Sequence, residues 1–139
     1  LLIGLVKNLR YSLLFIFTLF FSTILVYLMK IYFNVARPEE ILVPFFTNSF
    51  PSFHATIATV FFTIIMYTFD DELTSSLRVI FNTLMISLIF TIAFSRIYLG
   101  AHWFSDVFFG VILGSLISYF FIILFKSVID SRSGTSVVK

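Results

Sequence analysis

The chain contains no cysteine and few charged residues, and these two absences exclude several classes of protein. Without cysteine there is no disulfide scaffold, no thiolate metal site and no cysteine nucleophile. Only 12% of the 139 residues are charged, whereas a water-soluble domain usually carries about 25%. The net charge of +2 is too small for a nucleic-acid-binding surface, so we expect no nucleic-acid partner.

Apolar side chains make up most of what is present. Hydrophobic residues account for 60% of the chain, 21 residues are phenylalanine, and the mean hydropathy is +1.09. A soluble domain usually has about 45–50% apolar residues. Because too few polar groups remain to cover a surface in water, we expect an integral membrane protein surrounded by membrane lipids.

Four runs without charged residues are long enough to cross a membrane as helices, namely residues 11–29, 53–69, 79–95 and 107–125. The first would extend about 28 Å as a helix, close to the roughly 30 Å hydrocarbon core of a bilayer. Backbone groups in lipid must satisfy their own hydrogen bonds, so we expect helices despite the high content of phenylalanine and β-branched residues. The predicted fold is all-α, a polytopic transmembrane helix bundle with four membrane-spanning helices.

A signal peptide is the competing interpretation of the first run, because Lys7 and Arg10 precede it. The run is longer than the usual apolar region of about 7–15 residues, and no small-residue cleavage site follows it. We therefore divide the chain into a transmembrane domain, residues 1–129, and a flexible cytoplasmic tail, residues 130–139.

Four crossings place the connecting segments alternately on two sides of the membrane. The side of both termini carries six basic residues: Lys7, Arg10, Arg78, Lys126, Arg132 and Lys139. The other side carries three: Lys30, Arg37 and Arg96. Cytoplasmic segments are richer in Lys and Arg, so the side of the termini is predicted to be cytoplasmic. The second side then faces the periplasm, the exterior or an organelle lumen, and a bacterial inner membrane is our default assignment.

Chemically reactive residue types gather on the non-cytoplasmic side. Both histidines of the chain lie there with three cations: His54, His102, Lys30, Arg37 and Arg96. Ionisable groups at membrane depth are costly and are therefore functional candidates. Three positive charges suit a phosphate group and the charge on its oxygens during transfer. The pattern predicts phosphoryl transfer, in which the two imidazoles divide the nucleophilic and acidic roles.

The spacing of the acidic residues distinguishes the two histidines. Asp106 follows His102 at the spacing of one helical turn, where its carboxylate can hold a ring N–H and stabilise positive charge on the imidazole. His102 is therefore the better candidate for the nucleophile. His54 has no acid at that spacing and is the better candidate for the general acid. Ser52, just before a predicted helix start, offers its hydroxyl and nearby backbone N–H groups to phosphate.

Three strings of these residues resemble the signature motifs of the phosphatidic acid phosphatase type 2 superfamily of membrane lipid phosphatases. The family patterns are K-x-x-x-x-x-x-R-P, P-S-G-H and S-R-x-x-x-x-x-H-x-x-x-D. The residues that match are Lys30, Arg37 and Pro38, then Pro51, Ser52 and His54, then Ser95, Arg96, His102 and Asp106. The motifs occur in order, on one predicted membrane face, and the resemblance covers most of the chain.

The resemblance implies a hydrolase that cleaves a phosphate monoester or diphosphate on a lipid headgroup without a metal or cofactor. It implies a phosphohistidine intermediate on His102, with Asp106 as its partner and His54 as general acid. The residues implied to bind phosphate are Lys30, Arg37, Ser52, Phe53 (through its backbone) and Arg96. A lipid phosphotransferase stays open as an alternative because its first half-reaction is identical, and so does a catalytically silent membrane scaffold.

The chain departs from the family pattern in two respects. Phe53 stands where the family usually has glycine, and its N–H stays available to phosphate only if the backbone avoids positive φ. Family members commonly have six crossings, so we expect either two helices before Leu1 or a minimal version. The motifs suit undecaprenyl diphosphate, phosphatidylglycerol phosphate, phosphatidate and lipid A phosphates alike.

Each of these residues also has a purely structural interpretation. Lys30 can extend from a helix end toward the headgroups, and Arg37 can anchor the chain at the interface. Asp106 can cap the last helix, and His102 beside Trp103 can belong to an interfacial aromatic belt. None of these interpretations requires the observed spacing, so the joint pattern favours the catalytic one.

Two further features have more than one interpretation. Residues 39–50 are apolar and broken by Pro44, which fits a lid or a guide for a lipid tail, and equally an interfacial anchor. Gly110 and Gly114 form a small-x-x-x-small pattern that permits close helix contact. Packing within one chain and a homodimer both explain that pattern.

Overall fold

The computed structural model describes residues 9–38 and 48–133, with side chains described through Ser127. The described chain forms four long helices, α2 (Leu9–Phe33), α3 (Phe53–Phe69), α4 (Ser75–Tyr98) and α5 (Phe104–Ser133), and a short 3-10 helix, η1 (Asp70–Glu72). No strand occurs in these ranges. The predicted all-α transmembrane bundle is therefore confirmed.

The helices extend beyond the charge-free runs from which they were predicted. α2 continues past Lys30, and α4 includes both Arg78 and Arg96. Long basic side chains can carry their charge to the headgroup region while the backbone stays helical, so charge marks the edge of the hydrocarbon and not the helix end. All four helices are long and apolar enough to cross a membrane, and the chain is an integral membrane protein.

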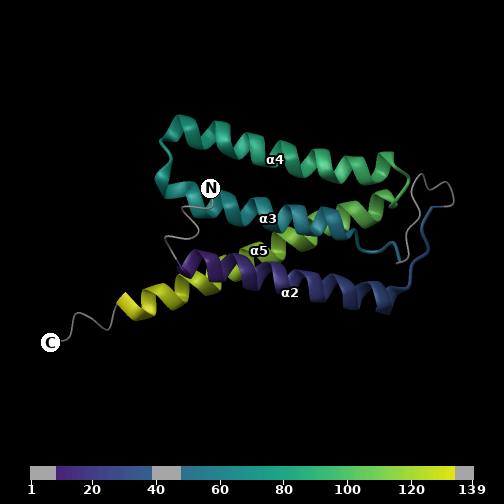
Figure 1. The fold of residues 1–139 in the computed structure, drawn as a ribbon, viewed down its shortest axis with the longest axis horizontal. Coiled ribbons are helices and arrows are strands. Elements are labelled where there is room, and N and C mark those ends of the chain that lie inside the picture. Colours follow the sequence, from purple (N-terminus) through teal and green to yellow (C-terminus); the bar gives the residue numbers. More distant parts are fainter. Residues whose placement is uncertain (1–8, 39–47, 134–139) are drawn as a thin grey trace.

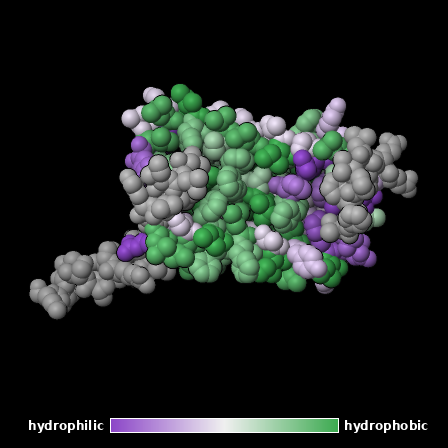
Figure 2. Space-filling view, viewed as in Figure 1, coloured by the Kyte–Doolittle hydropathy of each residue, from purple (hydrophilic) through white to green (hydrophobic). Residues whose placement is uncertain are grey.

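The helices alternate in direction along one bundle axis (Figure 1). α3 contacts α2, α4 and α5, and it is the most buried of the four. The segments that precede α3 and α5 lie at one end of the bundle, and η1 lies at the opposite end. Figure 2 shows hydrophobic residues over the middle of the molecule and hydrophilic residues toward its two ends, as expected when the flanks face lipid.

The bundle core is small because most apolar side chains point outward. Val60 and Ile64 of α3 are fully buried and pack with Leu14 of α2 and Ile117 of α5. Many phenylalanines, Phe90 among them, lie exposed on the outer surface. In water such exposure would indicate a misfolded or interacting surface, whereas in a bilayer it provides the contact with lipid tails.

Two glycines set the distance between α3 and α5. A Cβ added at Gly114 would lie 2.7 Å from the carbonyl oxygen of Thr56 and 2.8 Å from Cβ of Thr59. One added at Gly110 would lie 3.0 Å from the carbonyl oxygen of Ser52. The small face of α5 is therefore occupied by α3 of the same chain. Packing within one chain explains the pattern, which no longer argues for a homodimer.

Two predicted segments fall partly outside the described residues. Residues 39–47, most of the segment that we interpreted as a lid or an anchor, lie outside them, as do residues 134–139 of the predicted tail. α5 continues to Ser133, so the first residues of that tail are helical. The lid and the flexible tail stay predictions.

Candidate active site

A polar site is built where α2 ends and α3 begins. Lys30, in the last turn of α2, is only 7% exposed, and its Nζ donates to the carbonyl oxygens of Asn48 at 2.6 Å and Ser49 at 3.2 Å. In return, Nδ2 of Asn48 donates to the carbonyl oxygen of Lys30 at 3.0 Å. Ser49 is fully buried, and its hydroxyl donates to the carbonyl oxygen of Ala36 at 3.0 Å. These bonds hold the described chain on both sides of residues 39–47 together around the lysine.

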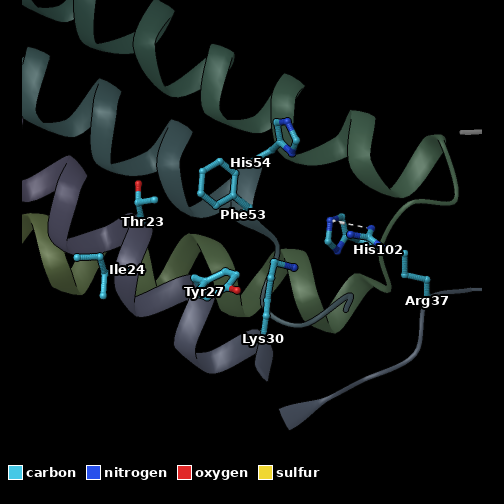
Figure 3. Close-up of a pocket in the computed structure, with 8 residues that line it drawn as sticks. All are labelled: Thr23, Ile24, Tyr27, Lys30, Arg37, Phe53, His54 and His102. Carbon is cyan, nitrogen blue, oxygen red and sulfur yellow. Dashed lines mark hydrogen bonds between the residues drawn. The ribbon is translucent and has the colours of Figure 1, made fainter. Parts of the chain in front are cut away.

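Arg37 connects this loop to the turn before α5. Its Nη1 donates to the carbonyl oxygen of Ala101 at 2.5 Å and lies 3.4 Å from Nε2 of His102 (Figure 3). Nε1 of Trp103 donates to the carbonyl oxygen of Ala36 at 3.0 Å and joins the same two segments. The first and third sequence motifs, distant along the chain, thus meet at one end of the bundle.

Asp106 lies at the start of α5 and also next to His102, so it combines the capping role and the histidine-partner role that the sequence offered as alternatives. Its Oδ2 accepts the backbone N–H of Trp103 at 3.0 Å, which satisfies a backbone donor that precedes the first turn of α5. The same oxygen lies 3.5 Å from Nδ1 of His102, and both side chains are buried. His102 itself precedes α5 and does not lie on it. The two side chains therefore meet through the turn before α5, at ion-pair distance and without a hydrogen bond between them, and the shared helix face that we predicted for the pair is not present.

The surroundings of His102 keep its ring neutral. Burial lowers the pKa of His102 from 6.5 to about 3, and the positive charges of Arg37 and Lys30 act in the same direction. An arginine side chain can only donate, so Nε2 of His102 is the acceptor in the contact with Arg37. The ring proton then belongs on Nδ1, next to Asp106. This tautomer leaves a lone pair on Nε2, on the side of the cations.

A hollow of about 480 Å³ brings the reactive groups together; it is called the α2 hollow below. Its lining residues are Thr23, Ile24, Tyr27, Lys30, Arg37, Phe53, His54 and His102 (Figure 3). Five of the eight predicted site residues therefore line one space. Thr23, Ile24 and Tyr27 precede Lys30 on α2, so the space continues from the charged groups along the apolar part of that helix.

The other three predicted residues do not occur among the described residues that line the α2 hollow. Asp106 contacts Nδ1 of His102, whose ring lines the hollow. Ser52 is fully buried as the N-cap of α3, where its hydroxyl accepts the N–H of Ala55 at 3.4 Å. Nε of Arg96, in the last turn of α4, donates to the hydroxyl of Ser95 at 3.0 Å.

Phe53 starts α3 with an ordinary helical backbone. Among the described residues, Asn34 is the one non-glycine residue with positive φ. Phe53 therefore does not adopt the positive φ that would have favoured glycine at its position. N–H groups in the first turn of a helix lack helical partners and can bind an anion. The Phe53 ring lines the α2 hollow and meets the His54 ring edge to face, with centroids 5.9 Å apart.

Comparison with known proteins bears on the family of this chain. The sequence pattern described as "PAP2 superfamily" matches residues 11–130. The chain belongs to the PAP2 superfamily. This membership confirms the resemblance inferred from the three motifs.

One solved PAP2 structure is similar to this chain, the "first transmembrane PAP2 type phosphatidylglycerolphosphate phosphatase from Bacillus subtilis". The TM-score is 0.78 and the sequence identity is 25%, over 84% of this chain and 59% of that chain. The chain thus spans about three fifths of that PAP2 protein. No curated protein sequence matches the chain.

Sequence reasoning missed several residues around the PAP2 site. Thr23 and Tyr27 could have been found, because they precede Lys30 at helical spacing and so share its face. Asn48 and Ser49 gave no comparable signal, because their carbonyl oxygens reach Lys30 only through the closure of a loop. No group of three or more His, Asp or Glu side chains that could hold a metal occurs among the described residues.

Proposed function

We propose that this chain is a membrane-embedded lipid phosphatase that hydrolyses a phosphate monoester or diphosphate on a lipid headgroup. One observation carries the proposal: two imidazoles, His54 and His102, line one hollow with the cations Lys30 and Arg37. A nucleophile, an acid and fixed positive charge are what stepwise phosphoryl transfer requires. Membership of the PAP2 superfamily and the similarity to a protein named as a phosphatase support the same class of reaction.

In the first half-reaction, Nε2 of His102 attacks phosphorus and the bond from phosphorus to the lipid oxygen breaks. The electron pair leaves with that oxygen, which takes a proton from His54. Asp106 stabilises the positive charge on the phosphorylated ring. Arg37 exchanges its contact with Nε2 for a phosphate oxygen, and together with Lys30 it neutralises charge on the phosphoryl group.

In the second half-reaction, water attacks the phosphohistidine. His54, now without its proton, accepts a proton from this water, the phosphorus–nitrogen bond breaks, and inorganic phosphate leaves. If a second lipid or sugar hydroxyl replaces water, the same site is a phosphotransferase. Phe53, in place of the family's usual glycine, is the departure that favours a silent scaffold. Its helical backbone removes the objection that a phosphate contact would be lost there.

We assign the remaining phosphate contacts to Arg96 and to the backbone N–H of Phe53. Ser52 is buried as a helix cap, so we assign it the role of fixing the first turn of α3, where that N–H lies. No step requires a metal ion or a cofactor. Full activity with a chelator present is the expected result, and a loss that divalent ions restore would contradict this assignment.

We propose that the site lies at the non-cytoplasmic face of a bacterial inner membrane; the excess of basic residues on the side of the termini supports this orientation. A reporter fused after Lys139 should therefore be active in the cytoplasm. A reporter active only outside the cytoplasm would overturn this orientation.

The direct test uses the purified chain and a lipid phosphate labelled on phosphorus. Wild-type protein should acquire acid-labile bound phosphate, and His102→Ala should acquire none. His54→Ala should accumulate the label when the leaving group is a good one, because it still forms the phosphohistidine but lacks the base for its hydrolysis. Arg78→Ala, at the opposite end of the bundle, is the matched control and should behave as wild type. Equal label in wild type and His102→Ala would refute the mechanism.

A further inference from the structure

A second hollow adjoins the site on the other side of Phe53. It has about 260 Å³, lies between α3 and α4, and is called the α4 hollow below. Its lining residues are Phe53, His54, Ile57, Ala58, Phe61, Phe62 and Ile92. Among the described residues, the two hollows have just Phe53 and His54 in common. The reactive His54 therefore borders two apolar spaces, one along α2 and one along α4.

The Phe53 ring lines both spaces and forms part of the wall between them. The family pattern P-S-G-H has no side chain at this position, so a glycine there removes the ring's part of the wall beside His54. The ring is half-buried at the first residue of α3 and is held edge to face against His54 at an interplanar angle of 88°. Because the ring belongs to the lining of both hollows, it is an obstacle to a hydrocarbon chain that passes from one hollow to the other.

We infer that Phe53 is a specificity-determining residue that confines the lipid to the α2 hollow and selects phosphates carried on a single hydrocarbon chain. This inference rests on the proposed function. Thr23 lies two helical turns before Lys30, so the α2 hollow extends roughly 10 Å from the cation into the membrane. It offers one apolar path away from the phosphate, which suits a polyprenyl or monoacyl lipid.

A diacyl lipid presents a different shape to the same site. Its two chains diverge at the glycerol, close to the phosphate. With one chain in the α2 hollow, the second chain is directed at the Phe53 ring, and the α4 hollow behind that ring would be its nearest apolar space. The ring therefore disfavours lipids with two chains and leaves lipids with one chain unaffected.

The test compares two lipids that differ only in the second chain, dioleoyl phosphatidate and monooleoyl lysophosphatidate, in the same detergent micelles. Wild-type protein should have the higher kcat/KM for the one-chain lipid. Phe53→Gly should raise the ratio of two-chain to one-chain kcat/KM about tenfold or more, the scale on which a pocket discriminates by apolar bulk. Phe53→Ala removes the ring with a better helix former and should change the ratio in the same direction. Phe53→Leu keeps apolar bulk and should keep the wild-type ratio.

A double variant tests the route of the second chain. Ile92→Phe narrows the α4 hollow from the side of α4 and should leave wild-type activity unchanged, but in the Phe53→Gly protein it should reverse the gain with phosphatidate. Any of three results would overturn the inference. These are an unchanged ratio in both Phe53→Gly and Phe53→Ala, a wild-type preference for phosphatidate, and a gain in Phe53→Gly that Ile92→Phe does not reverse. If wild-type protein hydrolyses neither lipid and forms no phosphohistidine, the proposed function fails instead, and the inference fails with it.

Discussion

The two ends of the helix bundle both carry charge, and they hold it in different ways. At the η1 end, Arg78 and Asp70 form an ion pair of 3.4 Å whose side chains are 39% and 44% exposed. At the site end, the charged side chains of Lys30 and Asp106 are 7% and 1% exposed, and the neutral ring of His102 is 4% exposed. An exposed ion pair contributes at most about 1 kcal/mol, whereas buried charged groups require partners on every side.

This difference shows which feature marks a site in a membrane protein. Charged residues at the end of a spanning helix are common, because the headgroup region accommodates them. At the site end, however, Lys30 is held by loop carbonyls, Arg37 by the turn before α5, and Asp106 by the start of a helix. Burial combined with convergence of distant segments, and not charge alone, singles out this end as the functional one.

The largest contrast is expected from the same substitution at the two ends. Asp106→Asn keeps a carbonyl oxygen for the N–H of Trp103 but loses the negative charge next to Nδ1 of His102, so kcat should fall by about 10³–10⁴-fold. Asp70→Asn should leave kcat unchanged. The measurement is the steady-state release of inorganic phosphate from a lipid phosphate. Similar losses in the two variants would remove the distinction between the ends.

The next contrast uses arginine. A lysine at position 37 lacks the planar set of N–H donors with which Arg37 binds two phosphate oxygens, or binds phosphate and the carbonyl oxygen of Ala101 at once. In Arg37→Lys, kcat/KM should therefore fall by about 10²-fold. Arg78→Lys preserves the charge of an exposed pair and should be neutral. Inhibition by inorganic phosphate, measured in parallel, should weaken in Arg37→Lys alone. Unchanged phosphate inhibition in that variant would place Arg37 outside the phosphate site.

A smaller effect is expected from the two glycines at the contact between α3 and α5, one near the site and one farther from it. Gly114→Ala places a Cβ against the backbone of α3 and should lower stability by about 1–3 kcal/mol, seen as a lower thermal midpoint in detergent. In Gly110→Ala the new Cβ lies farther from the backbone of α3, so stability should fall less than in Gly114→Ala. Activity should fall more, because the new Cβ lies against Ser52 and displaces the start of α3. The opposite ranking of the two variants would show that α5 does not pack on α3 in this way.

The smallest effect concerns pH. The unfolded chain protonates His102 as the pH falls below 6.5, whereas in the folded protein its pKa is about 3. The unfolded state therefore binds more protons in this interval, and the folded state loses stability as the pH falls from 6.5 toward 3. The thermal midpoint should fall between about pH 7 and about pH 5, and it should fall less in His102→Gln. An equal decrease in both proteins would show that folding does not lower the pKa of His102.

The sequence by itself determined the surroundings, the helices and the local pairs. Charge-free runs in a chain with so few polar residues had to be helices, because backbone groups in lipid can satisfy their hydrogen bonds only within a helix or a closed barrel. Spacing along the chain also predicted that Asp106 reaches His102 and that Ser52 precedes a helix start, since both contacts are short-range.

Only the tertiary structure decided which of these residues share a space. It placed Lys30, Arg37 and both histidines around one hollow, left Ser52 and Arg96 outside its lining, and set the Phe53 ring between two hollows. These relations join segments far apart in the sequence, and their distances depend on how closely the helices pack. Packing distance results from the complementary shapes of two helix surfaces, which the periodicity of a single segment does not encode.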